Sequence, residues 1–147
     1  MSTSSHLPTP GPTVFETEGA IRIDIRAEAL INHAFLRVIH TSTREQIAVM
    51  ALPPDAEIGD EVRPDTDQLL VFVEGNGEAR VADYELAVEV GDLLSVEAGT
   101  RHNIINRATI PLRLITVFAP PAYAPGTVLE TMEVREPPVA DKWRPFP

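Results

Sequence analysis

The residues best suited to chemistry lie in one strongly acidic stretch of the chain. Residues 55–92 hold twelve Asp or Glu residues against two arginines, Arg63 and Arg80, and the whole chain carries a net charge of −10. Such a segment is either a solvated acidic face or the location of a cation site. Within it, Glu61 and Arg63 are two residues apart, so on a strand their side chains would point to the same face.

Three arrangements are open to this pair. In the first, Arg63 forms an internal ion pair with Glu61, which needs further hydrogen bonds because burying two charges costs desolvation. In the second, Arg63 holds the carboxylate or phosphate of a ligand through two parallel hydrogen bonds. In the third, Arg63 extends to the surface and binds Asp65 or Asp67.

The composition excludes several other kinds of site. The chain has no cysteine, which excludes disulfides, thiolate zinc sites, iron–sulfur clusters and a cysteine nucleophile. Gly75-Asn76-Gly77 is followed by Arg80 where a dinucleotide-binding loop needs a third glycine. The net charge of −10 argues against binding to nucleic acid or to an anionic membrane surface.

The 147 residues fit one domain between two proline-rich ends, because ten of the fourteen prolines lie in residues 1–13 or 120–147. We expect a disordered arm over residues 1–13, a folded domain over 14–128 and a proline-rich tail over 129–147. Trp143 and Phe146 of that tail could dock on the domain. No apolar run approaches the roughly 18 residues of a membrane span, and the start does not resemble a signal peptide, so we expect a cytoplasmic protein.

The spacing of apolar residues predicts an all-β domain. Apolar and polar residues alternate over 21–26 and 84–90, which is typical of half-buried strands. Further strands are expected over residues 35–39, 46–52, 69–73, 93–96, 103–106 and 112–118, with a turn at 74–77 and a short helix at 27–32. Strands that recur about every 8–12 residues with turns between them indicate a sandwich or a barrel.

Residues 55–106 resemble the two motifs of a small single-domain cupin, a double-stranded β-helix or jelly-roll barrel. The second motif runs from Gly91 to Asn106 at the family's spacing, with His102 in place and Glu97 where the family has proline. The first motif, which ends at Gly75, keeps its spacing, but both of its histidines, its glutamate and its first glycine are replaced. The resemblance covers about residues 30–128 and implies a cupin barrel with strands from about 20 to 118.

In metal-binding cupins, two histidines and a glutamate of the first motif and the histidine of the second hold a divalent ion inside the barrel. The resemblance places Glu61, Arg63, Gln68 and His102 at these positions. Glu61, Gln68 and His102 could still bind manganese, iron, nickel or zinc, but the Arg63 guanidinium has no lone pair to give. We therefore expect no cofactor, with a divalent transition metal as the alternative.

These four residues are expected to form the polar cluster of a pocket lined by Leu70, Phe72, Ile104, Ile115 and Val117. Arg63, Gln68 and Phe72 would bind a small anionic molecule, and His102 and Glu61 would act as acid and base. This favours a metal-independent isomerase, cyclase or lyase acting on a small organic acid, although whether the chain is an enzyme at all is left open. The alternatives are a metal-dependent dioxygenase or sugar isomerase with altered ligands, and a non-catalytic sensor or structural dimer. The resemblance also implies a homodimer.

Overall fold

Short antiparallel strands and one helix make up the chain over residues 13–132, which the computed structural model describes. In chain order, the elements are β1 (Val14–Thr17), β2 (Ala20–Ile23), α1 (Ile25–Ile31), β3 (Leu36–Thr41), β4 (Gln46–Leu52), β5 (Asp67–Glu74), β6 (Asn76–Val81), β7 (Tyr84–Glu89), β8 (Leu93–Val96), β9 (His102–Ile105), β10 (Leu112–Ala119) and β11 (Val128–Leu129). The expected all-β class is confirmed. All of the expected arm except Thr13, and most of the expected tail, including Trp143 and Phe146, lie outside the described residues.

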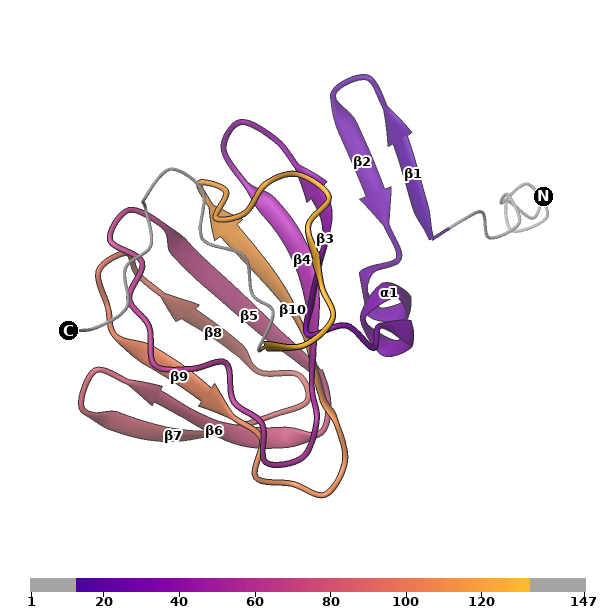
Figure 1. Cartoon of the computed structure of the whole chain (residues 1–147). Helices are drawn as coiled ribbons and strands as arrows, with labels where there is room; N and C mark the ends of the chain where they lie inside the picture. Colours follow the sequence, from indigo (N-terminus) through magenta and orange to yellow (C-terminus); the bar gives the residue numbers. More distant parts are fainter. Residues whose placement is uncertain (1–12, 133–147) are drawn as a thin grey trace, which may run out of the picture.

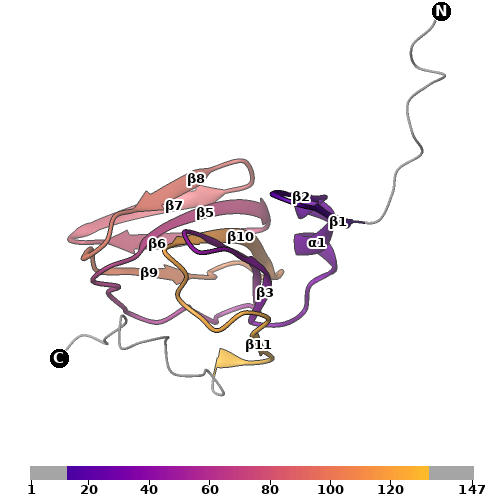
Figure 2. The same cartoon turned by 90° about the horizontal axis from the view of Figure 1, so that it is seen from above.

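Two antiparallel sheets enclose the core (Figures 1 and 2). One has six strands in the order β11-β3-β4-β10-β5-β8, and the other has three in the order β7-β6-β9. Strand β10 pairs with both β4 and β5, which come much earlier in the chain, so the chain winds back through the larger sheet. This connectivity matches the jelly-roll barrel that we expected. Strands β1 and β2 form a separate hairpin beside α1 (Figure 1).

The strand expected over 21–26 ends early because Asp24 starts a helix. Strand β2 ends at Ile23 and α1 begins at Ile25, two residues before the expected helix. The Asp24 carboxylate accepts a hydrogen bond from the backbone N–H of Ala27 at 3.2 Å, which satisfies a donor that the helix itself leaves free. Helix α1 then lies against β4, β5 and β10. Nothing in residues 13–132 forms a helix long and apolar enough to cross a membrane.

Alternate residues of strand β10 face the barrel interior and the outer side of the sheet. Its inward residues pack in the main core together with Leu70, Phe72 and Ile104, which face the interior as expected. That these three line a ligand pocket stays a prediction. Ile115 instead packs with the buried residues beneath α1, on the outer face of the sheet, and Val117 shares that face. The prediction that Ile115 and Val117 line the interior is therefore wrong, since residues two apart on a strand face one way and their neighbours the other.

Two glycines allow the turn between β5 and β6 to pack tightly. Gly75 has a φ of +83°, and a Cβ at this position would lie 2.6 Å from the Pro111 carbonyl oxygen. A Cβ at Gly77 would lie 2.6 Å from the Ile105 carbonyl oxygen. The turn expected at residues 74–77 is shorter than predicted, because only Gly75 lies between the end of β5 at Glu74 and the start of β6 at Asn76. Strand β6 itself was not indicated by the sequence pattern.

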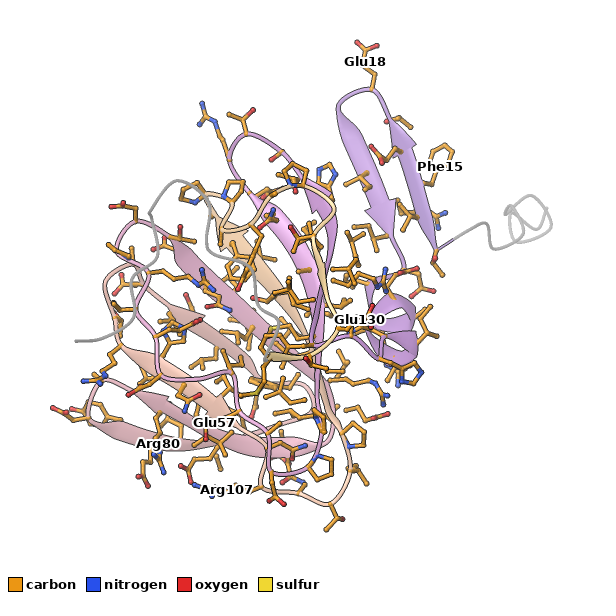
Figure 3. All side chains as sticks on the ribbon, in the orientation of Figure 1. Phe15, Glu18, Glu57, Arg80, Arg107 and Glu130 are labelled. Carbon is orange, nitrogen blue, oxygen red and sulfur yellow. The ribbon has the colours of Figure 1, made fainter. Side chains whose placement is uncertain are left out.

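The outer face of the six-stranded sheet carries a row of apolar side chains. Ile47, Val117 and Leu69 lie opposite one another on β4, β10 and β5. Ile47 and Val117 are half-buried and Leu69 is 36% exposed. Phe15 on the β1–β2 hairpin is also exposed and points away from the barrel (Figure 3).

Candidate functional site

Four polar side chains meet inside the barrel, namely Glu61, Arg63, Gln68 and His102, and each residue is at most 4% exposed. Gln68 lies on β5 and His102 begins β9, whereas Glu61 and Arg63 lie on the segment between β4 and β5. The backbone groups of Glu61 and His102 exchange two hydrogen bonds of 3.0 Å, which fixes this segment alongside β9. The structure thus brings together all four residues that the resemblance selected.

Arg63 is held by a carboxylate, a phenol and two aromatic rings. Its Nη2 lies 3.3 Å from Glu61 Oε1 and donates to the Tyr123 hydroxyl at 3.1 Å. The guanidinium carbon is 4.8 Å from the Phe118 ring centroid and 5.3 Å from that of Tyr123. Burial lowers the pKa of Arg63, but the Glu61 carboxylate and the Tyr123 hydroxyl outweigh burial and raise it above its ordinary value. Arg63 is therefore a fixed internal cation, and the surface arrangement with Asp65 or Asp67 does not form.

His102 connects Gln68 to Glu61. Its Nε2 lies 3.1 Å from Gln68 Oε1 and 3.5 Å from Glu61 Oε1. Its Nδ1 lies 3.0 Å from the Thr100 carbonyl oxygen, which accepts a hydrogen bond in the tautomer that carries a proton on Nδ1. The Gln68 amide nitrogen donates to the Thr116 hydroxyl at 3.0 Å. The imidazole is thereby fixed with Nε2 directed at an amide and a carboxylate.

Phe72 occupies the apolar part of the same interior. It lies two inward positions beyond Gln68 along β5 and packs in the main hydrophobic core. The structure therefore places Phe72 behind the polar cluster rather than among its hydrogen-bonding groups. Its contact with a ligand stays a prediction.

Two residues that the sequence reasoning missed complete the cluster. Tyr123 follows β10, outside both motifs, and is buried against Phe118 with ring centroids 5.6 Å apart and ring planes at 65°. Gln46 begins β4 and is fully buried beside Phe118, which pairs with Gln46 on one side and with Gln68 on the other. The available sequence signals were a glutamine that opens an apolar run and a tyrosine after Pro120-Pro121.

Two buried polar atoms on the segment between β4 and β5 have no hydrogen-bond partner among the described residues. They are Arg63 Nε and Thr66 Oγ1. Most buried polar groups in folded proteins are satisfied by protein or by water, so each exception calls for an explanation. For Arg63 the missing partner would be an acceptor, because a guanidinium can only donate.

A polar pocket of about 340 Å³ lies at the edge of the smaller sheet, and His102 forms part of its wall. Its other polar lining residues are Glu57, Asp60, Arg80, Asp83, Arg101 and Asn103. Glu57 and Arg80 are close together at this edge (Figure 3), and Arg101 pairs with Asp60 at 3.0 Å. Only His102 belongs to both this pocket and the interior cluster, so it separates the cluster from the outside.

The donor set does not fit a divalent metal ion. No three His, Asp or Glu side chains within residues 13–132 form a group that could hold a metal. Arg63 occupies one of the four implied ligand positions, and its charge would oppose a cation next to Glu61 by roughly 4 kcal/mol or more at about 4 Å. The polar cluster has the chemistry of an internal ion pair with a histidine beside it.

Comparisons with known proteins agree with this architecture. A family model described as a cupin domain matches residues 48–118. Uncharacterized protein L612 of Acanthamoeba polyphaga mimivirus is 34% identical over 119 residues, which cover 78% of this chain and 72% of that protein. Uncharacterized protein YrkC of Bacillus subtilis is 31% identical over 115 residues, which cover 74% of this chain. The matched region is only 62% of YrkC.

A solved structure is similar over most of its length. The crystal structure of BH2720 from Bacillus halodurans superimposes with a TM-score of 0.75 at 32% sequence identity. The match covers 76% of this chain and 89% of that one.

Proposed function

This chain belongs to the cupin family, and from that premise we propose that its barrel binds a small organic acid with Arg63 as the cation that receives it. The observation that carries the proposal is the buried Arg63 guanidinium, whose Nε has no acceptor among the described residues. A carboxylate oxygen is the acceptor that best matches a guanidinium in charge and geometry. No cofactor is needed for this binding.

The energetics of the cluster support a functional role. A buried ion pair is often no more stable than well-packed apolar residues of similar volume, because desolvation offsets its attraction. The barrel nevertheless keeps Glu61, Arg63 and His102 in an interior otherwise built from residues such as Leu70 and Phe72. A site for a molecule with an apolar body and one acidic group accounts for both the buried polar cluster and the apolar residues around it.

Acid–base chemistry is the second candidate function, and the 3.5 Å separation of His102 Nε2 and Glu61 Oε1 favours it. A proton taken from the ligand by one of these groups and returned at another ligand atom would isomerise an organic acid without an oxidant or reductant. Their place beside Arg63 would put the carboxylate of the ligand next to the proton-transfer groups. Cyclase and lyase reactions would use the same pair.

The metal-dependent alternative has less support, because Arg63 occupies a position where a side chain would have to coordinate the metal. The non-catalytic alternative, a sensor or structural dimer, uses the same fold without turnover. Ligand binding separates a purely structural dimer from an enzyme or a sensor, since both of the latter bind a small molecule.

Calorimetry with benzoate and its neutral analogue benzamide tests the proposal, after a thermal-shift screen of small carboxylates, phosphates and amides. At about 100 times its dissociation constant, a ligand that binds only the folded state stabilises by roughly 2.7 kcal/mol. We expect acids to bind and Arg63→Gln to abolish that binding. Arg37→Gln, which disrupts the 2.9 Å ion pair to Glu28 outside the barrel, is the matched control and should bind as before. Anion binding that persists in Arg63→Gln would contradict the assignment of Arg63.

A further inference from the structure

The loop after β10 is fixed to the start of β4 by one buried amide. Gln46 is 0% exposed, and its Oε1 accepts hydrogen bonds from the backbone N–H groups of Ala122 and Tyr123 at 3.1 and 3.0 Å. Its Nε2 donates to the Tyr123 carbonyl oxygen at 2.7 Å. These three bonds define the backbone position of Tyr123, a residue 77 positions further along the chain.

The position of Tyr123 in turn determines how Arg63 is presented. The Tyr123 ring packs edge-on against Phe118, and its hydroxyl accepts from Arg63 Nη2 at 3.1 Å. Glu61 Oε1 lies near the same Nη2 at 3.3 Å. Two acceptors therefore gather at one nitrogen of the guanidinium, while Nε has none among the described residues.

We infer that Gln46 is a positioning residue and Tyr123 a specificity-determining residue of the interior site. Gln46 holds Tyr123 in place, and the Tyr123 hydroxyl together with Glu61 occupies Nη2, which leaves the Nε–H of Arg63 to bind a single oxygen of the ligand. The inference rests on the proposed function and adds to it the edge of Arg63 that the ligand uses. It also explains why a polar, fully buried glutamine begins an apolar strand.

Nuclear magnetic resonance of the Arg63 Nε–H group tests the positioning without any ligand. We expect Gln46→Ala to move this signal because the Tyr123 ring, which shifts the resonances of nearby protons, is no longer held in place. We expect Tyr123→Phe to move it because the guanidinium loses the hydroxyl that accepts from Nη2. Asn106→Ala is the matched control. Asn106 is another fully buried amide with three hydrogen bonds to backbone, to Leu52, Ala108 and Ile110. An Arg63 signal that moves equally in the control, or that stays in place in Tyr123→Phe, would overturn the inference.

Binding of benzoate and benzamide tests the specificity. In Tyr123→Phe, the Nη2 N–H that no longer binds the hydroxyl could join Nε in holding both carboxylate oxygens while Glu61 keeps its own contact with Nη2, so benzoate affinity should rise about tenfold while benzamide affinity changes less. Equal changes for both probes, or none, would refute a role of Tyr123 in ligand choice. If wild-type protein binds no acid, the proposed function fails, and the resonance experiment still decides whether Gln46 and Tyr123 position Arg63. Tyr123→Phe keeps the ring, so it provides the test even if Gln46→Ala does not fold.

Discussion

The Arg63 guanidinium lies over the Phe118 ring, 4.8 Å from its centroid, on the interior side of the barrel. A cation over an aromatic face is attracted by the ring quadrupole, more strongly where water is excluded. Phe118 and Tyr123 thus provide part of the stabilisation that water would give an exposed arginine, and Glu61 provides the opposite charge. The effect of Arg63 on stability and the metal content expected of the protein follow from this internal cation.

Removal of the cation should destabilise the barrel strongly. Arg63→Ala leaves Glu61 as a buried carboxylate next to a neutral cavity, and we expect a loss of about 3–5 kcal/mol in the free energy of unfolding. Arg37→Ala, which removes a partly exposed ion pair, should cost about 1 kcal/mol or less. Urea titrations of both variants measure the difference. A loss within about 0.5 kcal/mol for Arg63→Ala would show that the pair contributes nothing to stability.

The protein as purified without chelator should contain well under one equivalent of transition metal. Replacing Arg63 by His and Gln68 by Glu in one variant would rebuild a set of two histidines and two carboxylates, so this variant should bind manganese, iron, nickel or zinc. Elemental analysis after dialysis measures both proteins. A stoichiometric ion in the wild type would contradict the prediction.

The ion pair outside the barrel should make stability depend on pH. A hydrogen bond from the Thr13 side chain, opposed by burial and aided by Arg37, lowers the pKa of Glu28 below its ordinary value of 4.5. A carboxyl whose folded-state pKa is lowered contributes stability above its unfolded pKa and loses it as the pH falls through the folded-state value. The stability difference between wild type and Glu28→Gln should therefore be constant from pH 7 to about 5 and shrink below about 4.5. Urea titrations over this range check the sign, and a difference that grows in acid would contradict it.

The expected homodimer can be tested on the outer face of the larger sheet. Contiguous exposed apolar side chains on a protein surface often mark an interface, and Leu69 is the most exposed member of the row with Ile47 and Val117. If a second copy covers this row, Leu69→Glu should convert a dimer to a monomer. Light scattering coupled to gel filtration gives the mass, with Leu86→Glu on β7 as the control. A monomeric wild type would end the expectation.

Local patterns in the sequence predicted most of the strands well. Residues 46–52 and 93–96 are strands with the expected bounds, because buried strands leave apolar runs of the right length between turn residues. The same reasoning failed at residues 24–26, where the Asp24 cap favoured a helix over a continuing alternation. It also overestimated the burial of β7, since Val88 is buried but Tyr84 and Leu86 are exposed.

The sequence by itself determined the fold family and the meeting of Glu61, Arg63, Gln68 and His102. The motif spacing was sufficient because members of the family pair the same strands, so the spacing fixes which residues lie side by side. Only the tertiary structure decided the partners of Arg63. Tyr123 is 60 positions from Arg63 and 77 from Gln46, and no local periodicity encodes contacts between segments so far apart. The tertiary structure also decided that Ile115 and Val117 point to the outer face of the sheet. The alternation along a strand defines two faces but does not say which of them packs against the core.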